Sequence, residues 1–503
     1  MKRIIVFFLM ASLLVFLVGG SVVLAQEPTE EPTVELTEEP TEEPTAEPTE
    51  EPTAEPTEEP AISAAAAADG PWSSTIYVSN PHASSTTVSI VFYDESGNQD
   101  ASYDVSGGLP AHGSAVIDIS AVGGLDSTWW GSAVVQSDSQ LAAAVALRVN
   151  SNTDREIYSG FTQANTTAYM PAVANAYGQL STLAVQNTSG SPATVSASYI
   201  SSNGMGNKSF GFTVPAYASK FLVSNSNNGV GGPSLPSGWL GSASFTSSGG
   251  EIVVLNHQPY TDSPKAVAYE GVSQGYTKIY YPTALQKVYT AKFTTFYAIQ
   301  NVGTTTANVR MTIYNTSGVS VGTVNTSLAS NAKISWEPRH AGAPEGFLGS
   351  AVVESTNGVS IAGIVNIGTL PMSGCPTGAG QTTAFTAPGE GAANVAIPWV
   401  EYKNTPNWRS FLAVQNIGTA TSGSVTVTYY NPNGSVAATH GLGTIPPGSK
   451  ANSNPSTAGA PASFVGSAEI RSSRSSDQLV VLTNNQQADQ CHAASLIGVS
   501  FAP

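Results

Sequence analysis

Apolar and polar residues alternate along short segments of this chain from about residue 70 onward. Val88-Ser-Ile-Val-Phe92, Val309-Arg-Met-Thr-Ile313 and Val425-Thr-Val-Thr-Tyr429 place apolar side chains at every second position. Because a β-strand points successive side chains to opposite faces, a period of two predicts strands with one buried face and one wet face. Turn residues interrupt the pattern about every 8–12 positions. The chain is therefore predicted to be all-β and antiparallel.

Five landmarks recur in the same order, in a unit of about 110 residues. The first is an apolar strand that ends in Asn, the second an alternating strand followed by Gly, and the third a short turn. The fourth is an aromatic residue shortly before Gly-Ser-Ala, and the fifth is another apolar strand that ends in Asn. The Asn residues of the first landmark are Asn80, Asn187, Asn301 and Asn416, and the Gly residues of the second are Gly97, Gly204, Gly318 and Gly434. The aromatic residues of the fourth landmark are Trp129, Trp239, Phe347 and Phe464, and the Asn residues of the fifth are Asn150, Asn256, Asn366 and Asn484.

Seven or eight short strands in about 110 residues fit an antiparallel β-sandwich. We expect sandwich repeats at residues 67–165, 166–276, 277–394 and 395–503. A single four-bladed propeller is disfavoured because blades of this length are too long for four strands. A solenoid is disfavoured because its repeats are usually about 20–45 residues. The first unit has no evident opening strand, whereas the others carry one near Pro171, Pro282 and Pro398.

Two segments precede the repeats. Lys2 and Arg3 followed by an uncharged apolar run to Ala25 predict a signal peptide at residues 1–25, with an uncleaved membrane anchor as the alternative. Residues 26–66 are a linker of Glu-Pro-Thr units whose Glu residues repel each other and whose Pro residues oppose helix. We expect a disordered, extended tether, and therefore a protein that is secreted or displayed at the cell surface.

The charge lies mostly in that tether. The chain has 35 acidic and 18 basic residues, and removing the tether and the signal start leaves 21 and 16. A body with so few charges, 6 His and 2 Cys is not typical of a nucleic-acid binder, and it suggests no metal and no cofactor.

The matching stretches Val185-Gln-Asn187, Val414-Gln-Asn416 and Gly349-Ser-Ala-Val-Val353 resemble those of secreted bacterial proteins from Chloroflexota-like lineages. The resemblance covers roughly residues 70–503. It implies tandem immunoglobulin-like cell-surface modules and brings no catalytic residues with it. In the second unit the motif reads Gly241-Ser-Ala-Ser-Phe245, so it tolerates change and suggests packing.

Few residues are candidates for chemistry. The repeated Asn residues could hold a ligand, but an Asn that ends a strand more often bonds the backbone of the next turn. The Gly-Ser-Ala serines lack a recurring His, so catalysis is not expected. Asp94 and Asp100 resemble half of a calcium loop, although an acidic turn is the preferred interpretation.

Unit four breaks the repeat with its aromatic residues. Trp129 and Trp239 align with phenylalanines and indicate a core position, whereas Trp399 and Trp408 have no counterparts in the other units. With Tyr402 they form a candidate ligand platform.

The two cysteines, Cys375 and Cys491, bracket unit four. An even pair in an exported protein suggests a disulfide.

We expect a non-enzymatic stalk or envelope component, similar to a surface layer, whose modules extend in series from the tether. The alternative is an adhesin or glycan-binding module with its site on the fourth repeat. Its partners would be envelope or extracellular polymers, or copies of itself. We expect no nucleic acid, and a membrane only through an uncleaved signal segment.

Overall fold

The computed structural model describes residues 3–10, 72–149, 154–260, 266–369, 382–404, 407–487 and 492–502. Nearly all of its elements are strands, which confirms the all-β prediction. The short helical turns among these residues are η2 (Ile119–Ala121), η4 (Pro338–Ala341) and α2 (Pro455–Ala458). The expected linker and residues 11–25 of the expected signal peptide lie outside the described residues. No helix in the described part is long and apolar enough to cross a membrane.

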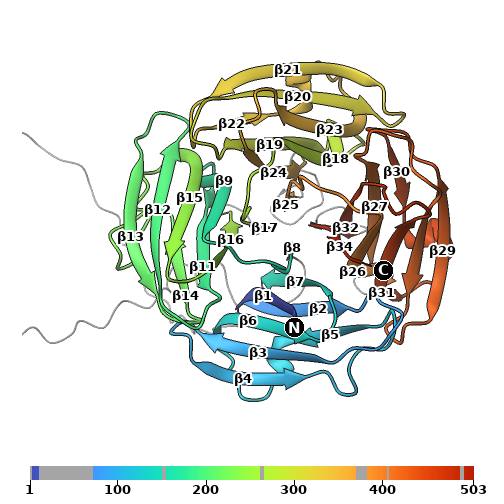
Figure 1. Cartoon of the computed structure of the whole chain (residues 1–503), viewed down its shortest axis with the longest axis horizontal. Coiled ribbons are helices and arrows are strands. Elements are labelled where there is room, and N and C mark those ends of the chain that lie inside the picture. The colour runs from blue at the N-terminus through green and yellow to red at the C-terminus, as the bar shows by residue number, and fades with distance from the viewer. Residues whose placement is uncertain are drawn as a thin grey trace, which may run out of the picture. The chain divides into compact units, whose positions relative to one another are not determined.

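The strands form groups with one common pairing scheme (Figure 1). Repeat one contains β1 (Arg3–Met10), β2 (Trp72–Ser79), β3 (Val88–Asp94), β4 (Gln99–Asp104), β5 (Ser114–Asp118), β6 (Trp130–Ser137), β7 (Ala142–Val149) and β8 (Asp154–Ser159). Repeat two contains β9 (Thr167–Ala176), β10 (Gln179–Leu180), β11 (Thr182–Asn187), β12 (Ala193–Ser201), β13 (Lys208–Val214), β14 (Ser219–Val223), β15 (Trp239–Ser248), β16 (Ile252–Pro259) and β17 (Ala266–Glu270).

Repeats three and four follow the same plan. Repeat three contains β18 (Lys278–Gln286), β19 (Thr294–Asn301), β20 (Ala307–Asn315), β21 (Ser320–Leu328), β22 (Lys333–Trp336), β23 (Phe347–Ser355), β24 (Ile361–Gly368) and β25 (Thr382–Thr386). Repeat four contains β26 (Asn394–Asn404), β27 (Trp408–Asn416), β28 (Val425–Tyr430), β29 (Val436–Gly443), β30 (Lys450–Ser453), β31 (Phe464–Ser472), β32 (Leu479–Gln487), β33 (Ala493–Ile497) and β34 (Val499–Ser500).

Each repeat has two antiparallel sheets. In repeat three the first sheet has the order β18-β23-β20-β21 and the second has the order β22-β19-β24-β25. In repeat four β26 also pairs with β27, so its two sheets join. In an immunoglobulin constant domain strands A, B, E and D share one sheet. Here the opening strand and the Asn-terminated strand lie in different sheets, so the resemblance predicts layered sheets but not this order.

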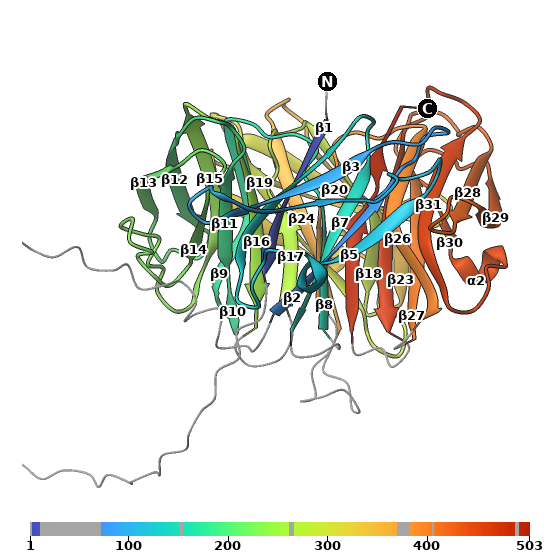
Figure 2. The ribbon, with the colours of Figure 1, turned by 90° about the horizontal axis from the view of Figure 1, so that it is seen from below.

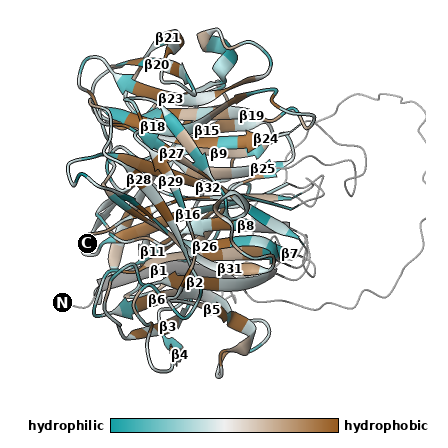
Figure 3. Ribbon diagram, turned by 90° about the vertical axis from the view of Figure 1, so that its right-hand side faces the viewer, coloured by the Kyte–Doolittle hydropathy of each residue, from teal (hydrophilic) through white to brown (hydrophobic). Residues whose placement is uncertain are grey.

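The two sheets of a repeat share one apolar core. In repeat two, Val195, Tyr199 and Phe245 of the first sheet pack with Val185 and Val254 of the second. These residues occupy alternate strand positions, as the sequence period predicts. Figure 3 shows hydrophobic residues concentrated on the strands.

The repeats close into a ring instead of extending in series. β8, β17 and β25 lie near the centre of the view in Figure 1. β8 contacts β17, β17 contacts β25, β25 contacts β33, and β33 returns to β8. Figure 2 shows the ring from the side. The described repeats therefore belong to one compact unit, and the expected extended stalk is wrong.

The ring closes because each second sheet is buried on both faces. One face packs on its own core, and the other packs on the preceding repeat. Val253 and Leu255 of repeat two join the core of repeat one, while Tyr77 and Ala144 of repeat one join the core of repeat four. A row of modules would leave these apolar faces in water at both ends, which burial in a ring avoids.

Repeat one does have an opening strand, contrary to expectation. β1 pairs antiparallel with β6 from Arg3 opposite Ser137 to Met10 opposite Trp130. Its sequence, Ile4-Ile-Val-Phe-Phe8, is rich in β-branched and aromatic residues that suit a strand. β1 thus takes the place that β9, β18 and β26 hold in the other repeats.

Candidate functional site: a cleft between repeats two and three

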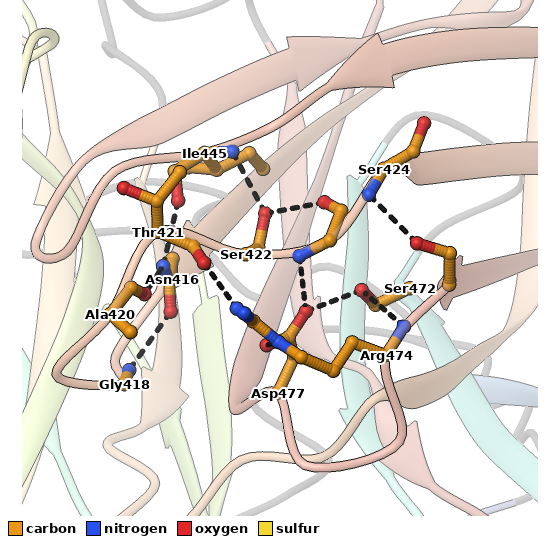
Figure 4. A network of polar contacts seen from close by, with 12 residues as sticks. Asn416, Gly418, Ala420, Thr421, Ser422, Ser424, Ile445, Ser472, Arg474 and Asp477 are labelled. Carbon is orange, nitrogen blue, oxygen red and sulfur yellow. Dashed lines mark hydrogen bonds and ion pairs between the residues drawn. The ribbon is translucent and has the colours of Figure 1, made fainter.

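The repeated Asn residues prove to be structural. Asn416 is buried; its Nδ2 donates to the carbonyls of Ala420 (2.8 Å) and Ile445 (2.7 Å), and its Oδ1 accepts from the amide of Gly418 (2.9 Å) (Figure 4). Asn301 bonds Thr305, Leu328 and Gly303 in the same way, and Asn80 and Asn187 repeat the pattern. Each Asn fixes the turn that follows its strand, so the preferred interpretation is confirmed.

The Gly-Ser-Ala motif packs one repeat against the next. A Cβ on Gly349 would lie 1.9 Å from the carbonyl oxygen of Tyr314, so only Gly fits beside the neighbouring strand. Ser242 Oγ donates to the carbonyl of Asn331 (2.9 Å), and Ser350 Oγ donates to that of Gly448 (2.9 Å). Both acceptors lie in the turn just before the next repeat's short strand, β22 or β30, which explains why this motif recurs with the fold.

The acidic turn at Asp94 uses its carboxylate internally. Oδ1 accepts from the amides of Ser96 (2.9 Å) and Asn98 (2.7 Å), and Oδ2 accepts from the side-chain amide of Asn98 (2.9 Å). The carboxylate oxygens are therefore engaged within the turn, which supports an ordinary hairpin.

The predicted aromatic platform on repeat four is wrong. Trp399 is 1% exposed and stacks on Tyr77 of repeat one, with ring centroids 4.8 Å apart. Trp408 is 0% exposed and lies in the core of repeat four. Tyr402 is partly buried, and its hydroxyl accepts a hydrogen bond from Ser456 (3.1 Å). Trp399 departs from the repeat pattern where repeat four contacts repeat one, and both tryptophans are buried, so their rings cannot stack on a sugar.

Cys375 and Cys491 both lie outside the described residues, so their disulfide stays a prediction. Cys375 belongs to the segment between β24 and β25, and Cys491 to the segment between β32 and β33. The strands that follow these two segments, β25 and β33, contact each other.

A cleft of about 530 Å³ lies between repeats two and three. This volume is within the range of small-molecule sites, roughly 300–1,000 Å³. β9 and the turn after it supply its first wall, with Ala172, Ala174 and Tyr177. The Tyr177 side chain is 81% exposed at the rim, and its φ of 54° places it in the tight turn before β10.

A line of amides stiffens this first wall. Gln258 Nε2 donates to Gln179 Oε1 (2.7 Å), and Gln179 Nε2 donates to the Tyr260 hydroxyl (2.5 Å). Asn256 Nδ2 donates to Gln258 Oε1 (3.0 Å) from inside repeat two. The amides are held in place before any ligand arrives, which lowers the entropic cost of binding.

The second sheet of repeat three forms the facing wall. Phe296 and Ala298 come from β19, Lys333 from β22, and Ile364 and Asn366 from β24. Phe296 is 43% exposed, although it stands on a strand that is otherwise buried. The cleft therefore combines apolar walls, exposed aromatic rings and a few convergent polar groups.

Lys333 is the cation of this cleft. Its ammonium donates to Ser335 Oγ (3.2 Å), and it makes no ion pair within the described part of the chain. Burial lowers the pKa of Lys333 to about 8, because desolvation penalises the charged form. The Oδ1 of Asn366 is buried and has no hydrogen-bond partner among the described residues.

A second cavity of about 580 Å³ also lies between repeats two and three. Serine and threonine side chains of β12, β13 and β15 line it, with the turns of repeat three at Gly303 and Asn331. No charged side chain of the described residues lines it, so it is the weaker candidate.

Sequence reasoning missed the cleft because its residues come from many short segments spread between Ala172 and Thr382. Phe296 does not stand out in the sequence, because aromatic residues are common on strands. Lys333 follows a short turn of the repeat, at the position that Ser114 occupies in repeat one. One feature of the sequence could have indicated the cleft, namely a charged residue on the strand that pairs with the Asn-terminated strand. Lys333 is that residue, and it lies opposite Gln300.

Comparisons with known proteins match a named family only at the Glu-Pro-Thr segment. Residues 25–62 match the family model of the PT disordered repeat. No curated protein sequence matches the chain. Among solved structures, Thermotoga maritima 1070 is 14% identical and covers 23% of this chain and 94% of its own, with a TM-score of 0.19. The α-L-rhamnosidase of Streptomyces avermitilis, solved with L-rhamnose, is 7% identical over 81% of this chain and 55% of its own, with a TM-score of 0.11. TM-scores this low say nothing about fold or function. The PT repeat is compatible with a surface or extracellular protein.

Proposed function

We propose that this protein is a secreted or surface-tethered carbohydrate-binding module. The ring of sandwich repeats presents the cleft between repeats two and three. The observation that carries the proposal is this cleft, in which Tyr177 and Phe296 are exposed next to fixed side-chain amides.

The chemistry of the cleft suits a sugar. Aromatic rings offer flat apolar faces, and the polar ends of amides and hydroxyls can exchange hydrogen bonds with ligand hydroxyls. Gln179, Gln258 and Asn366 supply amides along both walls. In this proposal the module binds its sugar without changing it.

Export is part of the proposal. The PT repeat at residues 25–62 supports an extracellular or surface location. The resemblance to tandem immunoglobulin-like proteins of Chloroflexota-like bacteria supports the same location. Envelope or extracellular polysaccharides are then the natural partners.

A structural role remains the second candidate. Buried apolar faces hold the repeats together within one chain, and a ring of this kind can serve as the unit of a surface-layer-like lattice. Electron microscopy of the secreted protein separates the two candidates, because ordered lattices or fibres favour the structural role and dispersed rings favour the binding role.

Binding to a glycan array tests the proposal. We expect saturable binding by the wild type and at least a tenfold loss in Phe296→Ala, because the exposed ring is removed from the cleft. Phe411→Ala is the matched control: Phe411 is 41% exposed and, like Phe296, lies five residues before the Asn that ends its strand. Absence of any glycan binding, or equal loss in both variants, would contradict a carbohydrate site in this cleft.

A further inference from the structure

We infer that the cleft between repeats two and three selects an acidic sugar of the uronic-acid type, whose carboxylate pairs with the ammonium of Lys333. The inference rests on the proposed function, because it names the class of sugar that the proposed site takes. Its first support is the charge of the site: Lys333 lines the cleft, and no Asp or Glu among the described residues lines it.

The ammonium of Lys333 has more N–H donors than it uses within the described residues. It can donate three hydrogen bonds and accept none. In the described part of the chain it bonds only Ser335 Oγ, at 3.2 Å. A partly buried cation without a counter-ion is costly, and an incoming anion removes that cost. A ligand carboxylate therefore gains a charge-assisted hydrogen bond at this position, whereas a neutral hydroxyl gains an ordinary one.

An unsatisfied acceptor in the same cleft selects for a hydroxyl. Asn366 Oδ1 is buried without a hydrogen-bond partner among the described residues, and Asn366 lines the cleft with Lys333. A uronic acid supplies a carboxylate for the ammonium and ring hydroxyls for the polar side chains that line the cleft. Phe296 adds an apolar face for the ring.

The equivalent lysine of repeat four provides the contrast. Lys450 lies opposite Gln415 as Lys333 lies opposite Gln300. Lys450 is 8% exposed and does not line this cleft, whereas Lys333 is partly exposed. The repeat thus places a lysine at this position twice, and Lys333 is the one that lies in the cleft.

The pH dependence follows from the titratable groups around the cleft. Besides Lys333, these are the hydroxyls of Tyr177, Tyr260 and Tyr297 among the described lining residues. The pKa of Lys333 is lowered to about 8 and that of Tyr297 is raised, both by burial. Above pH 8 the lysine loses its charge, so preference for an acidic sugar should fall between pH 8 and pH 9.5.

Isothermal titration calorimetry of the full chain with oligogalacturonate, and with neutral galacto-oligosaccharide of equal length, tests the inference. At pH 7 we expect the acidic sugar to bind at least about tenfold more tightly, in line with the strength of a hydrogen bond to a charged group. Lys333→Met should bring the two affinities together, pH 9.5 should do the same for the wild type, and Lys450→Met should leave the preference intact.

The outcomes are separable. Equal affinity for both sugars in the wild type, or a preference that survives in Lys333→Met, overturns the acidic-sugar inference and leaves carbohydrate binding in place. Failure of the wild type to bind either sugar also overturns the acidic-sugar inference, and only failure to bind any sugar of the glycan array, with ring folding verified by circular dichroism, overturns the proposed function as well.

Discussion

The interface between repeats four and one differs sharply from the interface between repeats two and three. At the four–one interface, buried Glu469 bonds His112 Nδ1 (2.6 Å) and Arg471 (2.8 Å), and Arg471 also donates to a backbone carbonyl of repeat one. At the two–three interface the equivalent of Glu469 is Ser244, which accepts from Gln300 (3.0 Å). Two cavities remain at the two–three interface.

The difference shows that copies of one repeated fold can form junctions with different roles. The four–one junction joins segments about 360 residues apart, so its closure carries the largest loop entropy. The contacts of buried Glu469 and the Trp399–Tyr77 stack distinguish that junction from the two–three junction, where Ser244 stands in place of Glu469. The two–three junction joins neighbouring repeats, and it can leave space for a ligand.

Breaking the charge cluster should have the largest effect. Glu469→Ala removes a buried carboxylate and with it the charge-assisted hydrogen bonds to His112 and Arg471, and we expect the free energy of unfolding to fall by about 2–4 kcal/mol. Chemical denaturation followed by tryptophan fluorescence measures this change. An unchanged unfolding midpoint would show that the cluster does not hold the ring closed.

Glu354→Ala is the control for that measurement. Glu354 pairs with Lys278 and Arg310 in repeat three, and its side chain is more exposed than that of Glu469. Exposed ion pairs contribute about 0–1 kcal/mol, so the control should change stability little.

The fold was largely predictable because its strands obey simple rules. Alternation in Val309–Ile313 gave the first sheet of repeat three, and the Gly-Ser-Ala motif indicated packing. Ring closure also left a signal, since Ile252-Val-Val-Leu255 and Leu479-Val-Val-Leu482 are apolar at every position. Such runs indicate a strand buried on both faces, whereas an exposed module would need alternation.

The candidate site was not predictable in the same way. A departure from the repeat, as at Trp399, marks a special environment, but ring closure and ligand binding both produce one. Phe296 and Ala172 line the same cleft only because the two repeats pack side by side, and no local sequence pattern encodes that packing.

A second prediction compares the two equivalent lysines. Burial lowers the pKa of Lys450 from 10.5 to about 8, so the unfolded chain holds this proton more tightly than the folded one. Stability is therefore diminished below pH 8 and recovers as pH rises from about 8 to 10.5. We expect Lys450→Met to raise stability at pH 7 by roughly 2–3 kcal/mol.

Unfolding of wild type and Lys450→Met at several pH values provides the measurement. The difference between them should shrink across pH 8–10.5, and this difference isolates Lys450 from the buried tyrosines, whose raised pKa values act in the opposite direction above pH 10. Lys333→Met should show a smaller gain, because Lys333 is more exposed to water. A constant difference at all pH values would contradict a titrating Lys450.

The smallest effect on stability is expected in the cleft itself. Tyr177 is 81% exposed in a turn, and Phe296 is 43% exposed, so removing either ring uncovers little buried apolar surface. Tyr177→Ala should change the free energy of unfolding by less than about 0.5 kcal/mol, and Phe296→Ala by less than about 1 kcal/mol. If denaturation shows losses comparable to that of Glu469→Ala, the rings hold the two–three junction together and the contrast between the junctions disappears. Retained stability with lost sugar binding would instead mean that exposed aromatic residues at this junction are kept for the ligand, because packing gives no reason to place them in water.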